Sequence, residues 1–328
     1  MRGDRVAIAQ VGCGYWGRNL ARNFAELGVL VGVVDGDPAV AERISAATAA
    51  PVRSLEEVLA DPMIDGISLA TPAVSHSSLA LRAIAAGKHV FIEKPLALTP
   101  DDAERVVAAA AATDRVLMVG HLLRYHPIFL ALQKLVESGA LGRLRYIYSN
   151  RLSLGKFRTE EDVLWSFAPH DLSMVLALAD AMPDRVSAQG ASFVTDGIVD
   201  WCTCQLGFPS GLSGHIQVSW AHPFKEQRLV VVGDEAMAVF EDSEPEWGRR
   251  LALYRHRIDC NGPVPVPDKA EAEFVMVPRA EPLRSECEHF IMSIVSGVTP
   301  RTDGEEGLRV LKVLDRARRD LMQMRPVA

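Results

Sequence analysis

The sequence predicts a two-domain chain in which an α/β domain with a doubly wound parallel sheet precedes an α+β domain with a large, mostly antiparallel open sheet. Up to about residue 121, apolar runs alternate with helical patterns, as they do in βα units. The first run, residues 6–11, ends in a glycine-rich turn and a helical pattern. From residue 122 onward, strands of period two follow one another with few helices between them. We therefore place the domains at 1–121 and 122–328.

The composition argues against several classes of protein. A net charge of −7 and a pI near 5.8 argue against a nucleic-acid binder, which needs a basic surface. The five cysteines, at 13, 202, 204, 260 and 287, lack CxxC spacing, so they indicate neither a disulfide framework nor a metal site. Residues 1–5 lead directly into a strand rather than an apolar signal segment, and no apolar run reaches membrane-spanning length. We expect a soluble, unprocessed protein of a reducing cytoplasm.

The glycine-rich turn has the spacing G-x-G-x-x-G and comprises Gly12, Cys13, Gly14, Tyr15, Trp16 and Gly17. The first glycine permits the tight turn, the second lets the backbone approach a pyrophosphate, and the third lets the helix pack on the strand. A second apolar run, residues 29–34, ends at Asp35, where a carboxylate can bond the adenosine ribose and repel a 2′-phosphate. Such a turn also occurs in other doubly wound proteins, but strand, helix and acid in register favour a dinucleotide, and NAD over NADP.

Three later strands also end in candidate ligand residues. Residues 66–70 precede Thr71 and Pro72, residues 89–92 precede Glu93 and Lys94, and residues 116–119 precede His121. Open α/β sheets bind ligands at the carboxyl ends of their strands. Pro95 biases Lys94 away from helical geometry, so a stiff turn presents this lysine. His76, at the start of a helix, is either a cap or a neighbour of the cofactor.

The second half is predicted to contain a helix over 128–136 and then a sheet. The predicted strands are 144–152, 186–193, 199–208, 212–220, 228–232, 236–240 and 251–254. A short helix is expected at 172–179 with Asp171 at its start, and two amphipathic helices at 283–296 and 304–322. Pro245, Pro263, Pro265 and Pro267 indicate a surface loop region. An open sheet face that carries Tyr146 and Tyr148 would suit association of subunits.

Two features of this half have more than one interpretation. His170 lies just before the expected helix, and the pattern alone favours a capping or core histidine. The span 143–158 contains five basic residues and no acid, namely Arg143, Arg145, Arg151, Lys156 and Arg158. It is either a surface that grips a diphosphate or a solvated sheet face. Lys225 is a weaker candidate of the same kind, and Cys202 and Cys204 are expected to be small core residues.

Taken together, the motifs resemble the Gfo/Idh/MocA family of oxidoreductases over essentially the whole chain. The matching motifs are 12–17, Thr71-Pro72 with His76, Glu93-Lys94-Pro95, Gly120-His121 with Arg124 and His126-Pro127, His170-Asp171, and Thr302-Asp303-Gly304. The resemblance implies that Lys94 and His170 are catalytic and face the nicotinamide and the sugar carbon that is oxidised. It implies a cofactor site made of Gly12, Gly14, Tyr15, Trp16, Gly17, Asp35, Thr71, Pro72, His76, Glu93, Lys94 and His121.

The family pattern is not complete in this chain. Family members commonly carry an aspartate four residues before the histidine, and this chain has Ser166 there. Lys94 and His170 must then share the proton transfer without that acid. Our hypothesis is that His170 is the base and that the Lys94 ammonium polarises the oxygen, with the reverse assignment still open.

Four stretches, 146–152, 154–156, 164–171 and 220–226, are similar to the branch that contains UDP-N-acetylglucosamine 3-dehydrogenases. This similarity implies oxidation of the C3 hydroxyl of a UDP-sugar with NAD, ahead of transamination by a pyridoxal-phosphate aminotransferase, as in lipid A variants. The substrate residues expected from it are Arg124, Tyr148, Arg151, Lys156, Trp165, Ser166 and Lys225.

Three alternatives remain open at the level of sequence. They are a dehydrogenase of the corresponding UDP-sugar uronate, an inositol or free-sugar dehydrogenase, and a non-catalytic dinucleotide-binding sensor, since fold does not imply function. We expect a homo-oligomer, dimer or tetramer, formed through the open sheet face. Nucleic acid and membrane are not expected as partners.

Overall fold

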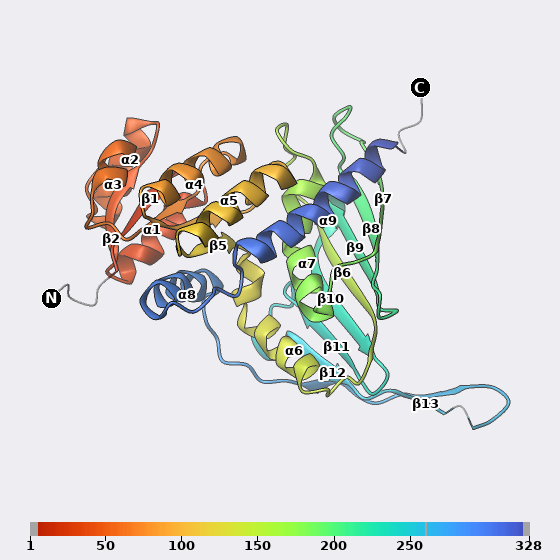
Figure 1. The fold of residues 1–328 in the computed structure, drawn as a ribbon. Coiled ribbons are helices and arrows are strands. Elements are labelled where there is room, and N and C mark those ends of the chain that lie inside the picture. Colours follow the sequence, from red (N-terminus) through yellow and green to blue (C-terminus); the bar gives the residue numbers. More distant parts are fainter. Residues whose placement is uncertain (1–5, 260, 324–328) are drawn as a thin grey trace. The chain divides into compact units, whose positions relative to one another are not determined.

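Two compact units make up the chain, which the computed structural model describes over residues 6–259 and 261–323 (Figure 1). The first unit combines residues 1–125 with 281–311, and the second combines 126–280 with 312–328. Segment 281–311 was predicted to belong to the second domain, whereas the structure groups it with the first unit. Residues 1–5 and Cys260, which figure in the expectations on processing and cysteines, lie outside the described residues.

The first unit is built around a five-stranded parallel sheet of order β2-β1-β3-β4-β5. Its strands are β1 (Ile8–Val11), β2 (Leu30–Val34), β3 (Gly66–Leu69), β4 (His89–Glu93) and β5 (Leu117–Gly120). Its helices up to β5 and just after it are α1 (Gly17–Glu26), α2 (Pro38–Thr48), α3 (Leu55–Ala60), η1 (Ala73–Ser75), α4 (His76–Ala85), α5 (Pro100–Ala112) and η2 (Leu122–Tyr125). The predicted doubly wound parallel sheet is confirmed. The strand order reverses between β1 and β3, the switch point at which such sheets bind ligands.

Local signals in the sequence set these elements. β1 and β3 are buried along their whole length, as continuous apolar runs in a parallel sheet require. Thr99 caps α5 by accepting a hydrogen bond from the Asp102 amide, and Pro100 occupies the first helical position. α2 was not predicted, although Asp37 caps it in the same way.

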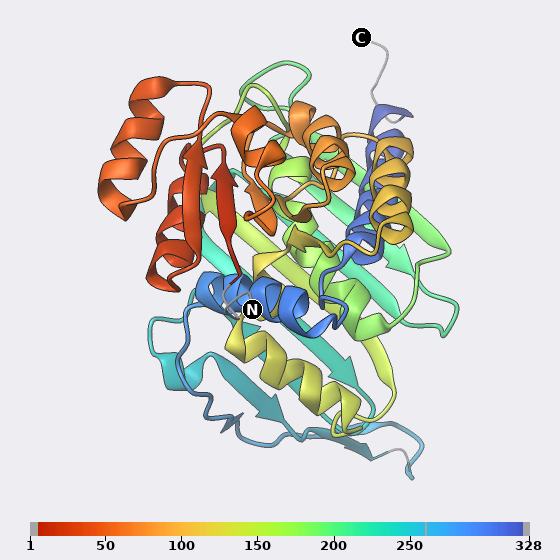
Figure 2. The same cartoon turned by 60° about the vertical axis from the view of Figure 1, so that its left-hand side comes forward.

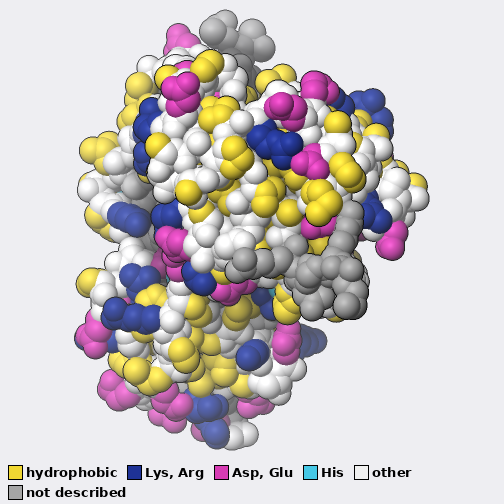
Figure 3. All heavy atoms as spheres, turned by 90° about the vertical axis from the view of Figure 1, so that its left-hand side faces the viewer, with side chains coloured by type: hydrophobic (Ala, Val, Ile, Leu, Met, Phe, Trp, Pro, Cys, Tyr) yellow, Lys and Arg dark blue, Asp and Glu magenta, His cyan; other side chains and the backbone are white. Residues whose placement is uncertain are grey.

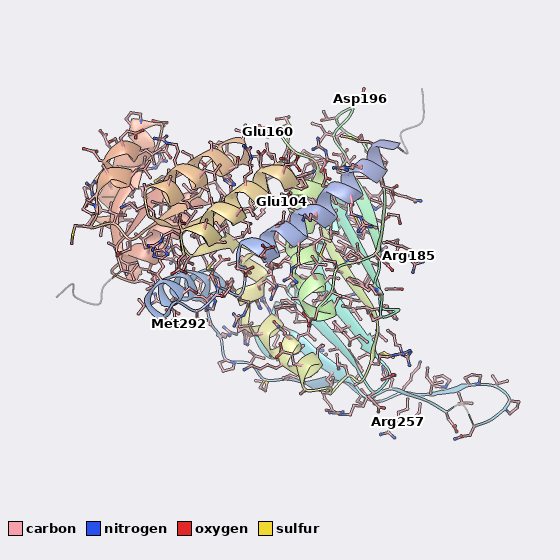
Figure 4. The ribbon with its side chains drawn as sticks, viewed as in Figure 1. Glu104, Glu160, Arg185, Asp196, Arg257 and Met292 are labelled. Carbon is pink, nitrogen blue, oxygen red and sulfur yellow. The ribbon has the colours of Figure 1, made fainter. Side chains whose placement is uncertain are left out.

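Two C-terminal helices, α8 (Pro282–Ser296) and the first part of α9 (Gly304–Gln323), complete the first unit. α8 lies beside α1 in both ribbon views (Figure 2). The rings of Phe24, Phe91 and Phe290 meet edge to face with centroids 5.8 to 6.5 Å apart, an arrangement that adds to the apolar burial. Met292, on the opposite side of α8, is 54% exposed and points outward (Figure 4). α8 is therefore amphipathic, as predicted.

An eight-stranded sheet of order β15-β12-β11-β10-β6-β9-β8-β7 forms the second unit. Its strands are β6 (Leu144–Leu154), β7 (Arg185–Ala191), β8 (Trp201–Gly207), β9 (Ser213–Ser219), β10 (Ala221–Gly233), β11 (Met237–Glu241), β12 (Leu251–Tyr254) and β15 (Glu273–Phe274). Its other elements include α6 (Pro127–Glu137), α7 (Val163–Ala179) and η3 (Trp247–Arg249). β6 and β9 run parallel and the other pairs are antiparallel. The prediction of a mostly antiparallel sheet is confirmed.

The two faces of this sheet differ. α6 and α7 pack on one face, against β6, β8, β9 and β11 (Figure 1). On the other face, the ring of Tyr148 stacks on His215 with centroids 5.6 Å apart, and Tyr146 is 48% exposed. No helix of the described residues covers this second face, which we call the open face (Figure 1).

The prediction for the helix at His170 is wrong at its start. α7 begins at Val163 rather than at residue 172, because the Asp162 carboxylate accepts a hydrogen bond from the Trp165 amide and caps the helix there. Pro169 lies inside the helix, and the helix is buried on nearly all sides, so no amphipathic period marks its first turns. His170 and Asp171 are therefore mid-helix residues, not a cap.

The proline-rich region was predicted to be a surface loop, and part of it forms a hairpin instead. β13 (Arg257–Asp259) pairs with β14 (Val266–Asp268), and all six residues are exposed. Arg257, labelled in Figure 4, lies on this hairpin. Pro267 is tolerated in β14 because the two-stranded hairpin has free edges.

Charged side chains of both signs are interspersed on the face drawn in Figure 3, with no broad basic area there. Within the described ranges, no helix is long and apolar enough to cross a bilayer.

Candidate active site

The glycine-rich turn after β1 has the geometry of a dinucleotide site. Gly12 has φ of 84°, and a Cβ on it would lie 2.6 Å from the Ala70 carbonyl oxygen at the end of β3. A Cβ on Gly17 would lie 1.9 Å from the Gly12 oxygen. By contrast, a Cβ on Gly14 would meet no atom within 4 Å. The first and third glycines are therefore needed for close packing, and the second faces open space that fits a pyrophosphate.

Asp35, at the carboxyl end of β2, is fixed beside this turn. One carboxylate oxygen accepts a hydrogen bond from the Cys13 amide at 2.6 Å, and the other accepts one from the Asp37 amide at 2.9 Å. Burial, together with the Asp35 charge, raises the pKa of the Cys13 thiol to about 12, so this cysteine stays a neutral thiol. A carboxylate that is fixed at this position can accept hydrogen bonds from the ribose hydroxyls of NAD.

His76 ties together the turns that follow β3 and β4. Its Nδ1 lies 2.8 Å from the Pro95 carbonyl oxygen, and its Nε2 lies 2.8 Å from the Thr71 carbonyl oxygen. The side chain is buried, and burial lowers its pKa. Thr71 Oγ1 lies 2.8 Å from Ser75 Oγ. The ring of His76 thus braces the backbone of two predicted site segments, which a simple helix cap would not do.

Glu93 links the glycine-rich turn to β4 and β5. Its carboxylate accepts hydrogen bonds from the Trp16 indole N–H and the Lys94 amide, and it covers Gly120, where a Cβ would lie 3.0 Å from Oε1. Burial raises the pKa of Glu93 to about 7, against the opposing effect of the Lys94 charge. Glu93 holds Trp16 and the backbone of Lys94 in place. Lys94 itself is partly exposed at the carboxyl end of β4.

His121 follows β5 and forms a buried polar cluster with Arg124 and Glu306. Its Nδ1 lies 2.6 Å from one carboxylate oxygen of Glu306, and Arg124 Nη1 lies 3.3 Å from the other. Burial lowers the pKa of Arg124, while Glu306 opposes that effect. Tyr15, also predicted to bind cofactor, is 79% exposed, and its ring lies under the Arg18 guanidinium. Gly14, Tyr15 and Pro72 are exposed, whereas the other residues predicted in the first unit are buried or half-buried.

In the second unit, the residue next to His170 anchors α7 to the sheet. Asp171 accepts hydrogen bonds from Arg151 Nε at 2.7 Å, from Arg151 Nη2 at 3.2 Å and from Ser149 Oγ at 2.6 Å. Both partners of this ion pair are buried, so each charge depends on the other. Arg151 was predicted to contact the substrate, and the structure places its guanidinium on Asp171.

His170 is partly exposed on α7, while Trp165, Ser166 and Pro169 around it are buried. Ser166 and His170 are four residues apart, so they lie on the same side of the helix. Pro169 has no N–H to donate to the Trp165 carbonyl, which locally opens the helix backbone just before His170. The Arg318 guanidinium lies over the ring of Trp165.

The other predicted substrate residues are spread over both sides of the sheet. Tyr148 lies on the open face, opposite to Ser149 and Arg151, because successive strand residues point to opposite faces. Lys156 and Lys225 are exposed on segments at the paired ends of β6 and β10. Within the basic span, Arg145 pairs with Asp234 and Arg158 pairs with Glu161. In the described ranges, no group of three His, Cys, Asp or Glu side chains could hold a metal ion.

Comparison with known proteins agrees with this geometry. Residues 6–121 match the description of an oxidoreductase family with an NAD-binding Rossmann fold, and residues 129–239 match the GFO/IDH/MocA C-terminal domain. The chain belongs to the Gfo/Idh/MocA family of oxidoreductases. Its cofactor is NAD, and the glycine turn and Asp35 provide the features that this cofactor requires.

Individual members of this family show similarity over nearly the whole chain. UDP-N-acetylglucosamine 3-dehydrogenase of Acidithiobacillus ferrooxidans is 32% identical over 92% of each chain. Inositol 2-dehydrogenase of Rhizobium meliloti is 28% identical over 91% of each chain. A solved structure of the Acidithiobacillus ferrooxidans enzyme superimposes with a TM-score of 0.85 over 97% of this chain and 98% of that one.

Three buried acids that interact with predicted residues were not among the predicted site residues. Glu306 binds His121, Asp171 binds Arg151, and Glu286 is fully buried near Glu93. Burial raises the pKa of Glu286 well above its usual value, and the nearby Glu93 raises it further. An acid inside the apolar stripe of a helix, as Glu286 is in α8, is a signal that can be read from sequence.

Proposed function

We propose that this protein is an NAD-dependent dehydrogenase that oxidises the C3 hydroxyl of UDP-N-acetylglucosamine to the 3-keto sugar. The observation that carries the proposal is the 32% identity to a UDP-N-acetylglucosamine 3-dehydrogenase, which extends over 92% of both chains and so includes both units. The inositol 2-dehydrogenase, at 28%, supports oxidation of a ring hydroxyl but a different substrate.

Oxidation of a secondary alcohol removes a hydride from carbon and a proton from oxygen. NAD, when bound, accepts the hydride. We assign the proton to His170, whose partly exposed imidazole is a base that can accept it. We assign to the Lys94 ammonium the hydrogen bond that polarises the same oxygen as the carbonyl forms. The hydroxyl O–H bond and the C3–H bond break, and the C3=O bond forms.

The remaining predicted substrate residues are assigned different roles according to their contacts and exposure. Because the Arg151 guanidinium is held by Asp171, we propose that it fixes α7 rather than the diphosphate. Lys156 and Lys225, both exposed, are the cations that we assign to the diphosphate. Trp165 and Ser166, on the same helix as His170, are assigned to the sugar.

Two partners belong to this proposal. A second copy of the chain covers the open face, where Tyr146 and Tyr148 provide apolar area, and gives a dimer or tetramer. A pyridoxal-phosphate aminotransferase consumes the 3-keto product, since a ketone is the acceptor that transamination requires.

The test is NADH formation by the purified protein with UDP-N-acetylglucosamine, its uronate counterpart and free inositol, each with an aminotransferase trap for the ketone. The proposal predicts turnover with the first substrate and a much lower kcat/KM with the other two. Turnover with inositol alone would replace the proposed substrate with a free polyol. Absence of turnover with all three, despite NAD binding, would favour a dinucleotide-binding sensor.

A further inference from the structure

Residues 302–307, which lead into α9, are held against β5 by hydrogen bonds and close packing. The Val119 amide donates to the Thr302 carbonyl at 2.8 Å, and Thr302 Oγ1 donates back to the Val119 carbonyl at 2.7 Å. The Glu306 amide donates to the Asp303 carboxylate at 2.8 Å, which starts α9. A Cβ on Gly307 would lie 2.6 Å from the Val119 side chain, so the first turn of α9 touches the strand. The position of Glu306 beside the end of β5 is therefore determined by backbone contacts.

Glu306 uses both carboxylate oxygens on the residues that follow β5. Oε2 lies 2.6 Å from His121 Nδ1, and Oε1 lies 3.3 Å from Arg124 Nη1. The side chains of His121, Arg124 and Glu306 are 2%, 7% and 5% exposed. The backbone of His121 is fixed too, since its amide donates to the Val119 carbonyl and its carbonyl accepts from the Arg124 amide.

A carboxylate can only accept, so the proton of the short contact is on His121 Nδ1. In the neutral ring Nε2 is then an acceptor, and no hydrogen bond to it is found among the described residues. Because Nε2 is not one of the buried polar atoms left without a partner, it is accessible, and a group bound at the end of β5 can reach it. His121 lies at the carboxyl end of β5, next to the strand that carries Lys94, where this type of sheet binds ligands.

We propose that Glu306 is a positioning residue that holds His121 in the Nδ1–H tautomer, so that Nε2 accepts a hydrogen bond from an N–H donor of the bound dinucleotide. The neutral N–H donor that NAD offers near the reacting carbon is its carboxamide. This inference rests on the proposed function only for the presence of NAD. By holding Arg124 with its other oxygen, Glu306 also couples the cofactor side of the site to a predicted substrate residue.

The experiment is a ¹⁵N–¹H spectrum of histidine-labelled protein without cofactor at neutral pH. Because the chain has nine histidines, His121→Gln identifies the resonances. The wild type is expected to show a protonated Nδ1 and a bare Nε2 at His121, and Glu306→Ala is expected to lose the Nδ1–H signal. Glu305→Ala is the matched control, since Glu305 is exposed on the same turn of α9. A protonated Nε2 in the wild type, or an unchanged His121 in Glu306→Ala, would overturn the proposal.

Two further readouts separate this role from a structural one. Addition of NAD to the wild type is expected to shift the His121 Nε2 resonance, and the absence of a shift at saturation overturns the assignment to the dinucleotide. Glu306→Gln keeps the shape of the side chain and is expected to raise the Kd for NAD about tenfold, the loss typical of one misdirected hydrogen bond. Its urea midpoint is expected to lie below that of Glu305→Gln, because the buried Arg124 loses its ionic partner, so the Kd is measured under conditions in which both variants are folded. These results do not depend on any sugar being oxidised, so failure of the proposed substrate would leave them standing.

Discussion

Glu93 makes the stability of the first unit depend on pH. Its pKa is raised from 4.5 to about 7 in the folded chain, mainly by burial. The unfolded state then ionises first as the pH rises, so the folded state loses stability between pH 4.5 and pH 7. At about 1.36 kcal/mol for each pH unit, this interval amounts to about 3 kcal/mol. The figure is an upper value, because Glu93 keeps a partly exposed edge.

Glu93→Gln removes the titrating group and keeps a side chain of the same size. We expect the free energy of unfolding of the wild type, relative to this variant, to fall by up to about 3 kcal/mol between pH 5 and pH 8. Urea unfolding followed by circular dichroism and tryptophan fluorescence measures this difference, and Glu305→Gln, at an exposed site, is the control. If the wild type and Glu93→Gln change in parallel over this range, the carboxylate is not held in its protonated form by burial, and the reasoning fails.

Four other predictions concern the glycine-rich turn, the ribose site, a buried ion pair and the two proposed catalytic residues. Gly17→Ala should weaken NAD binding at least about 100-fold in calorimetry, because the added Cβ would lie 1.9 Å from the Gly12 oxygen. Gly262→Ala is the control and should leave NAD binding unchanged, because its Cβ would have only one neighbouring atom, at 3.7 Å. Asp35→Asn should raise the kcat/KM for NADP relative to NAD about tenfold or more, because the charge that repels a 2′-phosphate is gone; an unchanged ratio would place the ribose elsewhere. Asp171→Ala should cost about 3–5 kcal/mol in urea unfolding by leaving Arg151 buried without its partner, against about 1 kcal/mol or less for Asp234→Ala, whose bridge to Arg145 is exposed. Lys94→Met and His170→Asn should each abolish turnover with little change in NAD affinity, and activity retained in either would remove that residue from the mechanism.

The first unit could be predicted because its determinants are local. The turn after β1 requires Gly12 for its positive φ and Gly17 for its contact with Gly12, and these residues are close in sequence. The rule that ligands lie at the carboxyl ends of parallel strands makes Thr71, Lys94 and His121 candidates without any tertiary information, and the structure places them just after β3, β4 and β5.

Residues that depend on distant partners could not be predicted. Glu306 is 185 positions from His121, and Asp171 is 20 positions from Arg151, so neither pairing has a local signal. The arginines of the basic span 143–158 seem from the sequence to have no acidic partners, because those partners lie outside the span, on α7 and next to β10 and α7. The start of α7 was missed because a helix buried on nearly all sides lacks the amphipathic period on which helix prediction depends.

Transfer of the hydride from C3 is the central claim, and isotopic labelling tests it most directly. The protein would be incubated with NAD and UDP-N-acetylglucosamine carrying deuterium at C3, and the dinucleotide product would be analysed by mass spectrometry. The account predicts NADH that contains one deuterium, formed at a slower rate than with the unlabelled sugar if hydride transfer limits turnover. NADH formed without deuterium would show that a different carbon is oxidised and would contradict the account.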